Sequence, residues 1–110
     1  MFKPDSVNIL GKHYEIKYCD NPADVDIYKR ESLWGQIDFW TRTIRIYDSG
    51  RKDGDIADTV FHEVLHGIVT QLDIEIENEE TAVRLIGMAL SDVFIRNGWL
   101  NDRTDTRPAE

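Results

Sequence analysis

Hydrophobic and polar residues alternate with a two-residue period in the first half of the chain. The alternation runs through residues 7–18, interrupted at Gly11-Lys12, which predicts two short strands joined by a turn. It recurs across residues 35–47, where the polar stretch 40–43 separates two alternating runs. Such a pattern predicts a β-hairpin over 35–47.

Two segments in the second half of the chain have the hydrophobic spacing of helices. Residues 55–72 place apolar side chains at helical intervals, and Asp53 or Asp55 can cap the start of this helix. A second helix is expected over residues 78–97, because a glycine follows it as a natural C-terminal cap. Strands followed by helices indicate an α+β fold, with a small antiparallel sheet packed on two helices.

The length of the chain predicts one domain. With 110 residues it can form one modest hydrophobic core, which we expect within residues 1–100. Residues 101–110 are rich in charge and are expected to form a disordered tail. Residues 23–34 fit either a short helix or an irregular connection, and the pattern does not decide between them.

The first predicted helix carries the motif His62-Glu63-x-x-His66. Residues four apart on a helix lie about 40° apart around its axis and roughly 6 Å along it. Both imidazoles can therefore reach one metal ion with Zn–N bonds of about 2.0–2.1 Å. Glu63 cannot easily bind that ion, but it can reach a water bound to it. This is the arrangement of a metalloprotease, with two ligands and a general base.

Chance is a weak explanation for this motif. Random shuffling of the residue composition produces this motif with a probability of roughly 0.6%, so a chance match is rare. Its helix is mostly apolar, and unpaired imidazoles are costly on such a helix. Two alternatives stay open, namely two hydrogen-bonded core histidines and a structural metal site.

A catalytic zinc site usually has a third protein ligand. Glu79 lies within about 30–40° of the mean direction of the second helix's apolar face, whereas Glu80 lies more than 100° away from it. A carboxylate that points toward a core is costly unless it is paired or bound to metal. We therefore expect Glu79 to be the third ligand, with Glu80 as the second choice. The other interpretation of Glu79 is a negative charge that complements the helix dipole.

Composition limits the partners and the location. The net charge of −8 argues against nucleic acid and anionic membranes, which attract basic surfaces. No apolar run approaches the length of a membrane span, and the N-terminus lacks the apolar stretch of a secretory signal. Cys19 is the only cysteine, which fits a reducing cytoplasm and a buried apolar role for this residue.

The motif and its surroundings resemble a known group of zinc peptidases. His62-Glu63-x-x-His66 followed by a glutamate at the next helix start is similar to the gluzincins. The whole chain looks like small zincin-like proteins of phages and prophages that are related to the ImmA/IrrE peptidase family. The similar stretches are residues 33–38, 43–46, 59–66 and 79–83, within a resemblance that covers roughly residues 7–98.

This resemblance implies a zincin-like fold and a zinc-dependent metallopeptidase that cuts peptides or proteins in the cytoplasm of a bacterial host. Zn²⁺ would be held by His62, His66 and Glu79, and Glu63 would act as the general base. Larger gluzincins also carry a His or Tyr that stabilises the oxyanion, for which His13 and Tyr47 are candidates. The alternative from another class is a non-catalytic zinc-binding domain that acts through protein–protein interaction or regulation.

Overall fold

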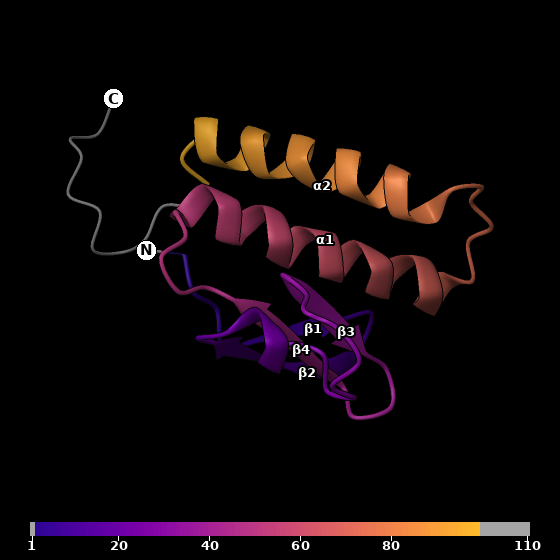
Figure 1. The fold of residues 1–110 in the computed structure, drawn as a ribbon. Coiled ribbons are helices and arrows are strands. Elements are labelled where there is room, and N and C mark those ends of the chain that lie inside the picture. Colours follow the sequence, from indigo (N-terminus) through magenta and orange to yellow (C-terminus); the bar gives the residue numbers. More distant parts are fainter. Residues whose placement is uncertain (1, 100–110) are drawn as a thin grey trace.

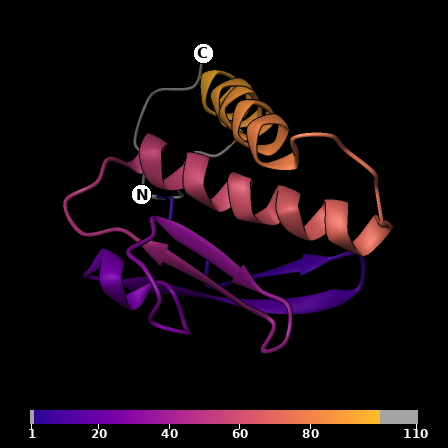
Figure 2. The same cartoon turned by 45° about the vertical axis from the view of Figure 1, so that its right-hand side comes forward.

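A sheet and two helices form three stacked layers in the computed structural model, which describes residues 2–99 (Figure 1). The elements, in chain order, are β1 (Ser6–Ile9), β2 (Lys12–Cys19), the short 3₁₀ helix η1 (Pro22–Asp24), β3 (Gly35–Asp38), β4 (Thr43–Tyr47), α1 (Asp53–Leu72) and α2 (Glu79–Arg96). α1 lies across one face of the sheet, and α2 runs antiparallel to α1 on the side away from the sheet (Figure 2). The expected α+β class is confirmed.

The sheet is mixed, with the strand order β1-β2-β4-β3. The predicted hairpin over 35–47 is present, and the two strands predicted within residues 7–18 also pair antiparallel. However, β2 and β4 are parallel neighbours, so the expectation of an antiparallel sheet is wrong. The parallel pair arises because β4, and not β3, is the strand of the second hairpin that lies next to β2. Ile44 and Ile46 on β4 are fully buried, and a strand that buries both isoleucines takes a central position next to β2. β3 becomes an edge strand as a result.

The core lies between the sheet and α1. It is built from the inward residues of the strands and one face of the helix, and it comprises Ile9, Tyr14, Ile16, Ile44, Ile46, Ile56 and Val60. Gly67 belongs to this contact, because a Cβ there would lie 2.8 Å from Cδ1 of Ile9 and 3.1 Å from Cδ1 of Ile37. The glycine inside the helix therefore has a structural reason, the close approach of two strands.

The connection between β2 and β3 is mostly irregular, and a buried carboxylate holds it together. Asp26 is fully buried and accepts hydrogen bonds from the side chains of Arg30 and Gln36, at 3.1 Å and 2.9 Å. Gln36 lies on β3 and also accepts a hydrogen bond from the backbone N–H of Ile27. These bonds attach the connection to β3, and the helix η1 occupies only its start.

The helix ends differ little from the expected ones. α1 ends at Leu72 as predicted, but it begins at Asp53, and its N-cap residue Lys52 makes no side-chain cap bond, so the predicted aspartate caps are wrong. α2 is within one residue of its predicted limits at both ends. The predicted tail lies outside the described residues. Within residues 2–99, no helix has the length and apolar character needed to cross a membrane.

Candidate metal centre

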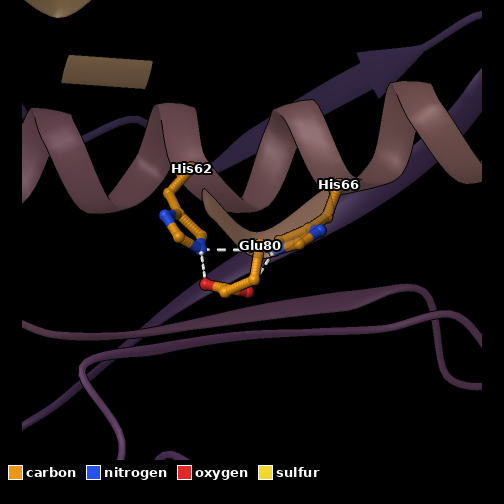
Figure 3. A group of neighbouring side chains, drawn as sticks. All are labelled: His62, His66 and Glu80. Carbon is orange, nitrogen blue, oxygen red and sulfur yellow. Dashed lines mark hydrogen bonds and ion pairs between the residues drawn. The ribbon is translucent and has the colours of Figure 1, made fainter. Parts of the chain in front are cut away.

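His62 and His66 project from the same face of α1, one turn apart (Figure 3). Their Nε2 atoms lie 3.2 Å from each other, and each side chain is about four-fifths buried, with exposed fractions of 20% and 18%. The sequence spacing thus brings the two imidazoles together as expected.

The carboxylate of Glu80 closes the group from the first turn of α2. One oxygen lies 2.6 Å from Nε2 of His62, and the other lies 2.9 Å from Nε2 of His66 (Figure 3). Within the described part of the chain, His62, His66 and Glu80 form the group of donors suited to a metal ion, with ligand atoms all within 4.8 Å of one another. Glu80, the second choice from the sequence, therefore occupies the position expected for Glu79.

Glu79 contacts the other nitrogen of the same imidazole. Its carboxylate lies 2.7 Å from Nδ1 of His66, on the side of the ring away from the donor group. A carboxylate in this place fixes the ring orientation and the tautomer of a metal-binding histidine, and it raises the basicity of the coordinating nitrogen. Glu79, the expected third ligand, therefore lies outside the donor group, against the opposite nitrogen of His66.

The correction has a geometric cause on α2. Hydrophobic spacing centres the predicted inner face of α2 on its large residues, whereas the buried residues of this helix are the small ones Val83, Gly87 and Ser91. At 100° per residue, Glu80 lies about 20° from the direction of Gly87, and Glu79 lies about 80° from it. Large apolar residues such as Ile86, which is 48% exposed, face outward instead.

The donor set fits zinc. Two imidazoles and one carboxylate are a known ligand set for catalytic zinc, with the fourth position left open. In a tetrahedral zinc site with bonds of about 2.0 Å, two donor atoms lie about 3.3 Å apart. The two Nε2 atoms, 3.2 Å apart, already have this separation. The Glu80 oxygens lie at hydrogen-bond distance from the imidazole nitrogens, and to coordinate an ion they would withdraw by roughly 0.4–0.7 Å.

Glu63 lies beside this group but is not part of it. Its side chain is buried, 7% exposed, and it accepts a hydrogen bond from the backbone of Ile37 on β3. Burial raises the pKa of Glu63 to about 7, against the lowering effects of His66 and of the Ile37 hydrogen bond. A carboxylate with such a pKa can both accept and release a proton near neutrality.

The pKa values of the two histidines are shifted in opposite directions. Burial lowers the pKa of His62 below its ordinary value, and Glu80 offsets only part of this effect. Burial also acts to lower the pKa of His66, but the hydrogen bond that its ring donates to Glu79 and the charges of Glu63 and Glu80 raise it overall. Neutral His62 and carboxylate-backed His66 are both suited to donating a nitrogen lone pair to a metal.

Two glycines allow the surrounding elements to approach the site. A Cβ at Gly87 would lie 3.3 Å from the backbone nitrogen of His62, so α2 passes directly over the motif. A Cβ at Gly35 would lie 2.6 Å from Cγ2 of Thr59 and 3.0 Å from Oε2 of Glu63, so β3 passes directly beside Glu63. Side chains at these positions would push both elements away.

A cleft of about 730 Å³ opens over the site. His62, Glu63, His66 and Glu80 line it, and the strand β3 contributes another part of its wall. The backbone of β3 faces this cleft with one edge. Trp34 and Gln36 pair with β4, so the N–H and C=O groups of Gly35 and Ile37 point to the free edge.

Sequence reasoning missed several residues of the cleft. Arg51 and Trp34 line one part, with the guanidinium 4.7 Å from the ring centroid, and Arg84 lines another part. No spacing rule points to single residues of this kind, which a site acquires from separate elements. The two oxyanion candidates, His13 and Tyr47, are not among the residues that line the cleft.

Comparison with protein-family models, with curated proteins and with solved structures finds no match for this chain.

Proposed function

We propose that this protein is a zinc-dependent peptidase of the gluzincin-like type. One observation carries the proposal: His62, His66 and Glu80 converge on one point in a cleft, and Glu63 is buried next to them without joining the donor group. A group that only holds a metal needs no carboxylate in that place. A hydrolase needs one, to activate water.

Bound zinc would supply a Lewis acid that polarises the scissile carbonyl and acidifies water. The chain's own residues supply the rest of the chemistry. Glu63 takes a proton from the attacking water and delivers it to the leaving amine, a cycle for which a pKa of about 7 in the free protein is suitable. The Ile37 hydrogen bond holds this carboxylate in place, and Glu79 holds the ring of His66.

The substrate in this proposal is an extended peptide that pairs with β3. The free N–H and C=O groups of Gly35 and the C=O of Ile37 face the cleft, so a peptide strand can add to the sheet there. Addition at this edge places the peptide backbone next to Glu63, whose carboxylate is a close neighbour of Gly35. Cleavage within a protein substrate would need an unfolded or looped segment.

The rest of the proposal concerns location and partners. The phage-type family and the cytoplasmic location rest on the motif resemblance and on the single cysteine. The net charge of −8 continues to argue against nucleic acid and anionic membrane surfaces as partners. A non-catalytic zinc-binding domain is the competing function, and only Glu63 separates the two.

Metal analysis of purified variants tests the site. After metal repletion and removal of excess ion, we expect one zinc per chain in the wild type and in Glu63→Gln. We expect loss of zinc in His66→Ala and Glu80→Ala, because each removes a donor. His13→Ala is the matched control for histidine removal, because His13 does not line the cleft. A wild type that holds no zinc after repletion would overturn the proposal.

A peptide-library cleavage assay tests catalysis. We expect the zinc-loaded wild type to cut peptides, and we expect Glu63→Gln to lose at least 100-fold in rate, as general-base catalysis contributes about 10²–10⁴-fold. If zinc binds but neither protein cuts any peptide, the competing function, a non-catalytic zinc domain, is the correct one.

A further inference from the structure

Arg84 is a cationic side chain that lines the cleft on the α2 side. It follows Glu80 by one helical turn, so the two side chains lie on the same face of α2. Its positive charge reaches His62, where it contributes to lowering the pKa of that histidine. Arg84 is therefore a permanent charge beside the candidate metal centre.

The guanidinium of Arg84 has no partner among the described residues. A glutamate four residues before an arginine normally forms the favourable helix pair. Here both oxygens of Glu80 contact the histidines instead, at 2.6 Å and 2.9 Å. Within residues 2–99, Arg84 consequently makes no hydrogen bond and no ion pair.

The other arginine in the cleft, Arg51, is hydrogen-bonded to the protein through both of its terminal nitrogens. Arg51 donates to the backbone oxygen of Tyr47 at 2.7 Å and to Oγ1 of Thr59 at 2.7 Å, and it stacks on Trp34. These hydrogen bonds connect the end of β4 to the first turns of α1. Of the two arginines that line the cleft, Arg84 is the one that has none of its donors bonded to another described residue.

We propose that Arg84 binds a carboxylate of the substrate, an inference that rests on the peptidase function proposed above. A guanidinium binds carboxylates in a bidentate manner with charge-assisted hydrogen bonds. Such a contact would offset the repulsion that a chain with a net charge of −8 exerts on an anionic peptide. The carboxylate belongs either to the C-terminus of a short peptide or to an Asp or Glu side chain near the scissile bond.

Peptide binding to the Glu63→Gln protein tests this without turnover. The probes are a neutral hexapeptide blocked at both ends, the same peptide with a free C-terminal carboxylate, and a series with Glu in place of one residue at a time. Calorimetry measures each dissociation constant. We expect at least one carboxylate peptide to bind roughly 10- to 100-fold more tightly than the neutral one. The peptide that does so identifies the source of the carboxylate.

Arg84→Gln in the same background should remove this preference and leave binding of the neutral peptide unchanged. Arg84→Lys should keep only part of it, because lysine lacks the bidentate fork. Arg96→Gln is the matched control, since it removes the same charge from α2 at a residue that pairs with Asp92 and does not line the cleft. We expect Arg96→Gln to keep the full preference.

The same titrations, run with zinc-loaded and with metal-free protein, separate the two proposals. A carboxylate preference that is absent, or that survives Arg84→Gln, overturns the role of Arg84 even if zinc binds and neutral peptides are cut. Failure of the wild type to bind zinc overturns the peptidase instead. A preference that depends on Arg84 in the metal-free protein then still supports the carboxylate site.

Discussion

Glu79 and Glu80 are adjacent in sequence but contact opposite sides of one imidazole. Glu80 lies against Nε2 of His66 and Glu79 lies against Nδ1. In the proposed zinc site this division would give each carboxylate a separate task, because Glu80 would coordinate the ion and Glu79 would orient the ring of His66. Two glutamates at a helix start would otherwise be interpreted as complements of the helix dipole.

Substitution of these two glutamates should affect zinc differently. We expect Glu80→Gln to weaken zinc binding far more than Glu79→Gln, because an amide oxygen replaces a charged donor. For Glu79→Gln we expect a loss of about 10- to 100-fold, the usual cost of removing a supporting carboxylate. Competition with a chromophoric chelator measures both affinities. Equal losses in the two variants would contradict the assignment of separate roles.

At the scale of elements, β3 and α2 enclose the site by passing close to α1. β3 is a short edge strand, and its Gln36 side chain is hydrogen-bonded to the buried Asp26 in the preceding connection. In front, it approaches Thr59 and Glu63 through Gly35. Glu63, the proposed general base, is therefore positioned by a strand whose free edge faces the cleft.

Gly35→Ala tests this approach. The new methyl group would meet Thr59 at 2.6 Å, and Thr59 has little freedom because its hydroxyl bonds to Arg51 and to the backbone of Asp55. We expect destabilisation by about 1–3 kcal/mol, as for overpacked cores, measured by urea unfolding. Gly54→Ala is the control, because a Cβ at Gly54 meets nothing within 4 Å. We expect it to change the free energy of unfolding by zero to about 1 kcal/mol in the stabilising direction. A Gly35→Ala variant as stable as the wild type would contradict the close packing.

At the scale of the whole molecule, α1 is the central layer and carries the site. The sheet covers one side of α1 and α2 covers the other, so a small chain buries its motif helix on two faces (Figure 2). This burial is also what raises the pKa of Glu63. The fold therefore holds a carboxylic acid in a place where ionisation costs stability.

The stability of the metal-free protein should consequently depend on pH through Glu63. The ordinary pKa of 4.5 is raised to about 7 in the folded state. Between these values the unfolded chain ionises first, so the contribution of this group is fully present below pH 4.5 and is lost as the pH rises to about 7. The loss corresponds to about 3 kcal/mol.

Glu63→Gln removes the titrating carboxylate, so this variant is the reference with which the wild type is compared. Urea unfolding at intervals from pH 5 to 9, with a chelator present, measures the free energy of unfolding of both proteins. We expect the stability of the variant relative to the wild type to increase up to about pH 7 and then to stay constant. Parallel pH profiles of the two proteins would show that Glu63 ionises normally in the folded state.

The sequence by itself determined the features that depend on local spacing. The two hairpins, the two helices within about a turn and the meeting of His62 with His66 follow from periods of two and 3.6 residues. Tertiary structure decided which strand is central and which glutamate meets the histidines, because both depend on how closely elements approach. Hydrophobicity weights large side chains, whereas close packing depends on small ones such as Gly87. Tertiary structure also left Arg84 without a partner among the described residues, because both oxygens of Glu80, the residue four positions before it, contact the histidines.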